Sequence, residues 1–118
     1  MEKETFELCP KFESAFELLG KRWTGLMIRV LLTGPKRFKD ISGMIPNMSD
    51  RMLAERFREL EAAGILVRRV YPETPVRIEY ELTDKGRALA PVMDSVQQWA
   101  DDWIPRPTVQ HKIALHSR

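Results

Sequence analysis

The stretch that decides the fold runs from residue 47 to residue 66 and reads NMSDRMLAERFRELEAAGIL. Ser49 is a suitable N-cap for a helix, and Gly64 has the backbone freedom that ends one. Three large apolar side chains between them fall on one line at 100° per residue: Leu53, Phe57 and Leu60. This spacing predicts an amphipathic helix that buries that line against a core.

The same stretch carries three arginines that point in two directions. Relative to the apolar line, Arg51 and Arg58 lie at about 160° and about 140°, so they face outward. Arg56 lies only about 60° from the line, where we expect it to brace the helix. The outward pair has two interpretations. Either it forms surface ion pairs with Glu55 and Glu61, or it contacts a negatively charged partner.

Length and composition indicate one soluble domain. The chain has 118 residues, 43% of them hydrophobic and 31% charged, which is an ordinary globular balance. No apolar run approaches the roughly 18 residues of a membrane span, and the acidic N-terminus does not resemble a signal peptide. A single cysteine excludes an internal disulfide and fits a reducing compartment. We therefore expect a cytoplasmic protein with no membrane partner.

The small net charge of +2 is unevenly distributed. Residues 21–58 hold nine lysines and arginines against three carboxylates, whereas residues 1–20 hold two lysines against five glutamates. A basic middle between acidic flanks indicates a localised positive face that would suit a polyanion. The alternative is a scatter of solubilising charges.

The spacing of apolar residues and the positions of glycine and proline predict the order of the elements. Helices are expected over residues 10–19, 23–32, 38–44 and 50–63, and strands over 65–71 and 77–82 around the loop PETP. A last helix covers residues 84–103, weakened or bent at Gly86 and Pro91. Residues 105–118 have little periodicity and read as a flexible basic tail.

This order predicts a winged helix-turn-helix, mainly α with a small β-hairpin (α+β), in a single domain over residues 1–104. The helix before the hairpin enters the DNA major groove in such folds, and its outward N-terminal half meets the base edges. The candidates on that half and just beyond it are Ser49, Asp50, Arg51, Ala54, Glu55 and Arg58.

Cations outside this helix are candidates for contacts to the DNA backbone. Lys36, Arg37 and Lys39 lie at the start of the third helix, where they would meet phosphates or else form a solvated loop. Arg77 follows the PETP tip and could contact the backbone or the minor groove. Two arginines in the first strand either assist or pair across the hairpin with glutamates: Arg68 and Arg69.

The first and last helices, residues 10–19 and 84–103, carry more apolar surface than so small a core needs. They either pack only on each other or also form the two-fold dimer interface that paired DNA half-sites require. The side chains concerned are Phe12, Phe16, Leu19, Leu89, Val92, Met93, Val96, Trp99 and Trp103.

The sequence contains no recognisable catalytic or metal site. It shows no Ser/His/Asp set, paired-carboxylate site or glycine-rich phosphate loop, and His111 and His116 lack further metal ligands. We expect no enzyme activity, cofactor or metal. Cys9 precedes Pro10 at a helix start, where N-terminal amides favour a thiolate. It is either a reactive thiol or a buried packing residue.

Together these segments resemble the HxlR family of bacterial winged-helix transcription regulators. The resemblance covers about residues 6 to 104. The motifs are most similar to those of the YodB-like branch, whose members repress genes and sense quinones and other thiol-reactive compounds. The matching segments are CPKFESAFELLGKRW (9–23), GPKRFKDI (34–41), SDRMLAERFRELEAAGIL (49–66), VYPETPVRIEYELTDKG (70–86) and the tryptophan-bearing last helix.

The resemblance implies a homodimer built from the first and last helices, with DNA contacts from the Ser49 helix and the wing. It also implies a sensing role for Cys9. Some members pair that cysteine with another near the C-terminus, and this chain has none. Oxidation would therefore give a Cys9–Cys9 link between subunits, a mixed disulfide or a sulfenic acid, and an electrophile would give an adduct.

The resulting hypothesis is a homodimeric repressor of a near-palindromic double-stranded DNA operator, released when Cys9 is oxidised or alkylated. Two alternatives remain open. One is a winged-helix regulator with a structural Cys9 and a non-covalent apolar effector between the first and last helices. The other is a winged-helix module that binds proteins instead of specific DNA.

Overall fold

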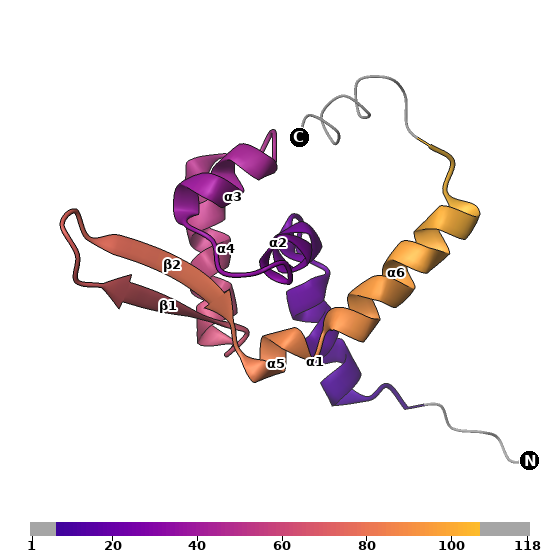
Figure 1. Cartoon of the computed structure of the whole chain (residues 1–118). Coiled ribbons are helices and arrows are strands. Elements are labelled where there is room, and N and C mark those ends of the chain that lie inside the picture. The colour runs from indigo at the N-terminus through magenta and orange to yellow at the C-terminus, as the bar shows by residue number, and fades with distance from the viewer. Residues whose placement is uncertain (1–6, 107–118) are drawn as a thin grey trace, which may run out of the picture.

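The computed structural model describes residues 7–106, so most of the predicted tail (105–118) and the first six residues lie outside it. Figure 1 shows α2 near the centre, with the hairpin on one side and α6 on the other. No helix in the described part of the chain is long and apolar enough to span a membrane. The elements are α1 Pro10–Leu19, α2 Thr24–Leu31, α3 Phe38–Met44, α4 Asp50–Ala62, β1 Leu66–Tyr71, β2 Arg77–Leu82, α5 Asp84–Arg87 and α6 Ala90–Trp103.

The helix-turn-helix unit is formed by α3 and α4. Ser49 caps α4 as predicted, because its hydroxyl oxygen accepts a hydrogen bond of 3.0 Å from the backbone N–H of Met52. In the turn before it, Asn47 takes a left-handed conformation with a φ of 69°, which Asn tolerates better than most residues. Gly64 has a φ of 77° and ends α4, also as predicted.

The inward face of α4 supplies the centre of the core. Leu53, Phe57 and Leu60 are buried, which confirms the predicted apolar line. They pack with buried side chains from α2, α3 and the hairpin: Met27, Leu31, Ile41, Ile45, Met48, Ile65, Leu66 and Leu82. Burial of these side chains, each worth about 1.5–3 kcal/mol for a large aliphatic or aromatic residue, fixes α4 against the other helices.

The hairpin is antiparallel, with Leu66 opposite Leu82 at its base and Tyr71 opposite Arg77 near its tip. β1 begins one residue later than predicted. The expected alternation of buried and exposed side chains along β2 is weak. Only Leu82 is buried, and Ile78 and Tyr80 are half-exposed. The hairpin extends beyond the core, so most of its side chains are half-exposed or exposed.

Backbone and aromatic contacts join the hairpin to both helices of the helix-turn-helix. The backbone of Lys36 pairs with Tyr80 in both directions, at 3.0 and 2.7 Å. The Tyr80 ring stacks on Phe57 of α4 with 3.8 Å between centroids and 14° between planes. Phe57 also meets Phe38 of α3, at 5.8 Å. The wing and α4 are therefore held in one fixed relation.

The prediction of one last helix over residues 84–103 is wrong, because the structure has two helices, α5 and α6. Thr83 caps α5 by accepting a 3.1 Å hydrogen bond from the N–H of Gly86. α5 ends at Arg87, with Ala88 as its C-cap, and Leu89 is the N-cap of α6. Pro91 has no N–H to donate, and this is tolerated in the first turn of a helix. The proline therefore marks a new helix start instead of a bend.

We predict that Gly86→Ala destabilises the fold. Gly86 is buried, and a Cβ there would collide with the carbonyl oxygen of Ile65, which accepts hydrogen bonds from the backbone and side chain of Thr83. The free energy of unfolding, measured by urea denaturation, should fall by about 1–3 kcal/mol. Gly43→Ala is the control, because a Cβ at Gly43 meets no atom within 4 Å. Equal losses in both variants would contradict this packing account.

Candidate nucleic-acid interface

The outer face of α4 presents an uninterrupted polar line. Arg51, Glu55 and Arg58 are all exposed, at spacings of four and three residues. The ion pairs considered for these arginines, with Glu55 and Glu61, are not formed, and neither arginine has a carboxylate partner within residues 7–106. Ala54 is half-buried beside this line. Both guanidinium groups are free to donate to a partner outside the chain.

The N-terminal end of α4 is tied to α3 by a side-chain contact. The hydroxyl of Ser42 donates a 2.9 Å hydrogen bond to the carboxylate of Asp50. Asp50 therefore helps to fix the angle between the two helices, and one of its oxygens is already engaged. No sequence motif predicts this contact, because Ser42 and Asp50 are eight residues apart and belong to different helices.

Arg56 braces α4 against the beginning of α2, as its boundary position predicts. Its Nε donates to the carbonyl oxygen of Arg22 at 3.0 Å, and its Nη1 donates to Glu59 at 3.1 Å. Lys21 lies 3.3 Å from the same glutamate. The Arg56 side chain is only 12% exposed. This arginine is thus committed to the fold.

The three cations before and within α3 have different environments. Lys36 donates to the Thr33 hydroxyl at 2.8 Å and to the Gly34 carbonyl at 3.2 Å, so its ammonium closes the turn after α2. Arg37 and Lys39 are exposed, and their side chains have no hydrogen-bond or ion-pair partner in the part of the chain that is described. Arg37 and Lys39 therefore keep all of their side-chain donors available, whereas Lys36 keeps its charge but uses two donors on neutral groups.

Arg77, the candidate contact at the wing tip, is held within the wing by two glutamates. The guanidinium bonds Glu73 at 2.8 Å and Glu79 at 2.7 Å, and it lies 3.9 Å from the centroid of the Tyr71 ring. The hydrogen bonds to Glu73 and Glu79 raise the pKa of Arg77 above its ordinary value. The hydrogen bond from Arg77 lowers the pKa of Glu73. Arg77 therefore shapes the loop.

Of the two arginines of β1, one pairs across the hairpin with a glutamate and the other does not. Arg69 pairs across the hairpin with Glu81 at 2.6 Å, and this hydrogen bond raises the pKa of Arg69. Arg68 is exposed and has no ion-pair partner among residues 7–106. Sequence reasoning ranked Arg77 above Arg68 as a wing cation, because the carboxylates that surround Arg77 become neighbours only in the folded hairpin.

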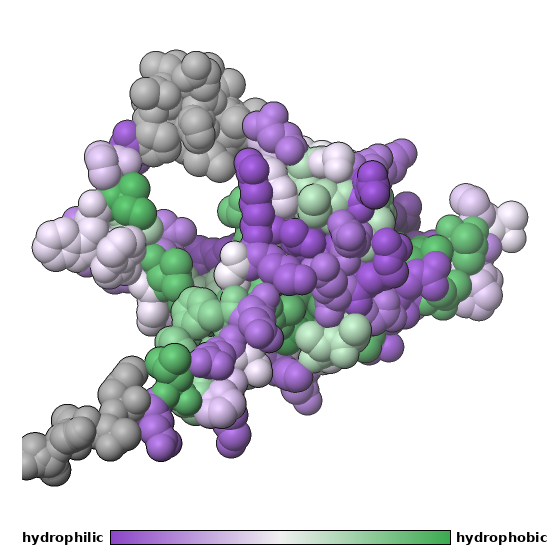
Figure 2. Space-filling model, turned by 180° about the vertical axis from the view of Figure 1, so that it is seen from behind, coloured by the Kyte–Doolittle hydropathy of each residue, from purple (hydrophilic) through white to green (hydrophobic). Residues whose placement is uncertain are grey.

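A second exposed surface is apolar and lies on the terminal helices. Figure 2 shows hydrophobic residues recurring along the α6 side of the molecule, at the left, away from a hydrophilic middle. Two of the candidate dimer residues instead serve the protomer, since Met93 is buried and Leu89 packs on the core. Leu19 is half-buried. The large exposed side chains are Leu8, Phe12 and Phe16 before and on α1, and Val92, Val96, Trp99 and Trp103 on α6.

Cys9 is exposed, so the alternative of a buried packing residue does not hold within the protomer. It is the N-cap of α1, and its carbonyl accepts a 3.0 Å hydrogen bond from the N–H of Glu13. One turn into the helix, Phe12 and Phe16 lie 5.0 Å apart and are themselves exposed. The thiol therefore lies beside the apolar surface of α1 and is open to small reagents.

Comparison with known proteins places the chain among transcription regulators. The HxlR-like helix-turn-helix family profile matches residues 18–108. Two relatives come from Bacillus subtilis (strain 168). The HTH-type transcriptional regulator YodB is 58% identical over 103 residues, covering 86% of this chain and 92% of YodB. The uncharacterised HTH-type regulator YvaP is 53% identical over 98 residues, covering 83% and 91%.

Solved structures agree with this assignment. The reduced form of YodB matches with a TM-score of 0.76 at 55% identity, covering 86% of this chain and all of that one. Quinone-bound YodB matches with a TM-score of 0.72 at 53% identity, covering 81% and all of that chain. The redox regulator HypR in its oxidised form gives 0.76 at 35% identity, covering 85% and all of that chain. The chain therefore belongs to the HxlR-like helix-turn-helix family and is a transcriptional regulator of the helix-turn-helix type.

Proposed function

We propose that the protein is a homodimeric repressor that binds a near-palindromic DNA operator and releases it when Cys9 is modified. The observation that carries the DNA contact is the exposed line of Arg51, Glu55 and Arg58 on α4. Arginine donates in a bidentate way to guanine in the major groove. Three other arginines are already paired with glutamates: Arg56, Arg69 and Arg77. Arg51 and Arg58 therefore remain as the donors on α4.

In this proposal the cations around α4 position the protein on the DNA backbone. Arg37 and Lys39 at the start of α3 and Arg68 on β1 have free charges. Contacts from such residues to phosphates add affinity without sequence information and weaken with salt. Arg77 acts indirectly, by keeping the wing loop in a shape that brings Arg68 toward the duplex.

Dimer formation rests on the apolar surface of α1 and α6. Helix geometry puts Val92, Trp99 and Trp103 within about 40° of one another around α6, and all three are exposed in the protomer. A monomer seldom exposes a contiguous apolar ridge of this kind. A two-fold pairing of this ridge would cover it and would present two α4 helices to paired half-sites.

The sensing step rests on the exposure of Cys9 and on the forms in which a relative has been solved. YodB has been solved in a reduced and in a quinone-bound form. In this chain a thiolate at Cys9 would add to a ring carbon of a quinone. The C–S bond forms as a ring C=C π bond opens, and a proton from solvent completes the hydroquinone adduct. The adduct would lie beside Phe12 and Phe16 on the proposed dimer surface, where added bulk would shift the spacing of the two α4 helices.

Two charge removals should separate base contacts from phosphate contacts. Arg51→Ala should cost about 1–3 kcal/mol of binding to the operator and relax specificity at one base position. Lys39→Ala should weaken binding to every sequence and reduce the salt slope by about 1. Fluorescence anisotropy with the promoter fragment upstream of the protein's own gene, and with a scrambled fragment, measures both. Lys11→Ala on α1 is the control, since Lys11 is exposed but lies on the terminal helix.

The groove assignment would be wrong if Arg51→Ala and Lys39→Ala bound the promoter like the parent at moderate salt. Equal weakening by Lys11→Ala would mean that net charge, and not the position of the charge, sets the affinity.

Cys9→Ser should bind DNA like the parent but resist release by benzoquinone. Serine is close to cysteine in size but cannot form the thiolate that adds to the ring. The measurement is DNA affinity before and after treatment, with mass spectrometry of the peptide that contains Cys9. Release of Cys9→Ser by benzoquinone would refute the sensing role while leaving the DNA contact intact.

Trp99→Glu should weaken the dimer by about 2 kcal/mol or more, because it places a charge where a large apolar side chain is to be covered. Sedimentation velocity over a range of protein concentrations measures the shift toward monomer. Gln98→Glu adds the same charge on another face of α6 and should leave the dimer unchanged. A parent protein that is monomeric at micromolar concentration would contradict the proposal.

A further inference from the structure

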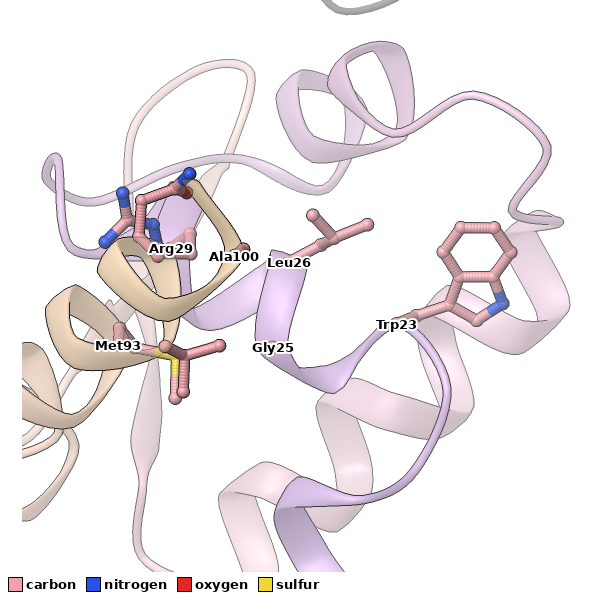
Figure 3. Close-up of a pocket in the computed structure, with 8 residues that line it drawn as sticks. Trp23, Gly25, Leu26, Arg29, Met93 and Ala100 are labelled. Atoms are coloured by element: carbon pink, nitrogen blue, oxygen red, sulfur yellow. The ribbon is translucent and has the colours of Figure 1, made fainter. Parts of the chain in front are cut away.

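An open cleft of about 350 Å³ lies between α2 and α6. Figure 3 shows Gly25 and Leu26 along α2, between Trp23 at one end and Arg29 at the other, with Met93 and Ala100 contributed by α6. Apart from Arg29 and Gln97 the lining is apolar. A cavity of roughly 150 Å³ is enough to bind benzene, so this volume suits a two-ring aromatic molecule.

The glycine on the α2 side keeps the cleft open. A Cβ at Gly25 would meet no atom within 4 Å, and the residue has no positive φ that would require glycine. Glycine within a helix is destabilising relative to alanine. Neither packing nor backbone conformation explains its presence in α2, whereas any larger side chain would project into the cleft.

The cleft and the proposed dimer ridge lie on adjoining faces of α6, with Val96 at their shared edge. At 100° per residue, the α6 residues that line the cleft, Met93, Val96, Gln97 and Ala100, centre about 90° away from the direction of Trp99 and Trp103. A second copy that covers the tryptophans would therefore leave the centre of the cleft unfilled. This separation favours a small molecule as the occupant.

Arg29 supplies the polar recognition at one end. It bonds the carboxylate of Asp94 through Nη1 at 3.2 Å, and its remaining donors have no partner within the described residues 7–106. The Asp94 side chain is 77% exposed, so this surface pair is weak. A carboxylate brought to the cleft can accept the two parallel hydrogen bonds that a guanidinium offers.

We infer that the α2–α6 cleft is a binding site for a small aromatic acid, with two fused rings against Gly25, Leu26 and Met93 and the carboxylate on Arg29. The site is non-covalent and separate from Cys9. Its ligand would lie between the winged-helix body and the dimer ridge of α6. Its occupation requires neither DNA binding nor thiol chemistry, so its test is independent of the proposed function.

The test is calorimetric titration of the full chain with 2-naphthoate, accompanied by NMR of the Trp23 indole and the Ala100 amide. We expect saturable binding at one site per chain and shifts at both residues. Gly25→Leu should weaken binding about tenfold or more, because its side chain occupies the cleft. Gly43→Leu is the matched control and should bind like the parent, since Gly43 also lies in a helix with open space around it.

Arg29→Gln provides a second variant, which removes the charge and places no added bulk in the cleft. It should weaken 2-naphthoate about tenfold, the loss of one charge-assisted contact, and leave the uncharged 2-naphthol unaffected. The inference is overturned if 2-naphthoate does not saturate, or if Gly25→Leu binds it like the parent. It is also overturned if the Trp23 signal follows protein dilution and not 2-naphthoate, because a second copy would then fill the cleft.

Discussion

The stack of Phe57 on Tyr80 joins the parts of the molecule that face DNA in the proposed complex. Phe57 belongs to α4, Tyr80 to β2, and the backbone of Tyr80 pairs with Lys36 just before α3. Ring centroids 3.8 Å apart leave little freedom for the wing to move relative to the helix. A helix in the major groove and a wing on the adjacent backbone must meet the duplex together, so this contact sets the geometry on which affinity depends.

Internal carboxylates determine which cations remain free. Arg56, Arg69 and Arg77 are each held by one or more glutamates, and they stabilise the brace of α4 and the shape of the wing. Arg51 and Arg58 have no such partner among the described residues. A net charge of only +2 is therefore compatible with a strongly positive local surface. The paired arginines fix the scaffold, and the free ones give that surface its charge.

Much of the fold follows from local signals in the sequence. The predicted bounds of α1, α3 and β2 agree with the structure, because Pro10 begins α1, Pro46 follows α3, and the apolar spacing is regular. The division of the last helix was missed. A proline near the start of a helix and a proline that bends one leave the same local pattern. The packing of α5 against the base of the hairpin, where Gly86 closely approaches Ile65, is a contact between distant residues that this local pattern does not contain.

The candidate site was predictable where it depends on helix periodicity and not where it depends on tertiary neighbours. The outward direction of Arg51 and Arg58 and the inward direction of Arg56 follow from 100° per residue. The hydrogen bonds of Lys36 depend on the conformation of the turn after α2. Those of Arg77 depend on the folded shape of the wing, so helix periodicity predicts neither set. The cleft beside Gly25 exists only because α6 crosses α2, which no spacing within either helix reveals.

Methylation interference on the promoter fragment upstream of the protein's own gene tests the central claim, that two α4 helices of a dimer enter the major groove. Dimethyl sulfate marks guanine N7 in the major groove and adenine N3 in the minor groove. We predict two groups of interfering guanines, with centres about 10 base pairs or a multiple of that apart, on one face of the duplex. Interference confined to adenine N3, or a single group of guanines, would contradict the account.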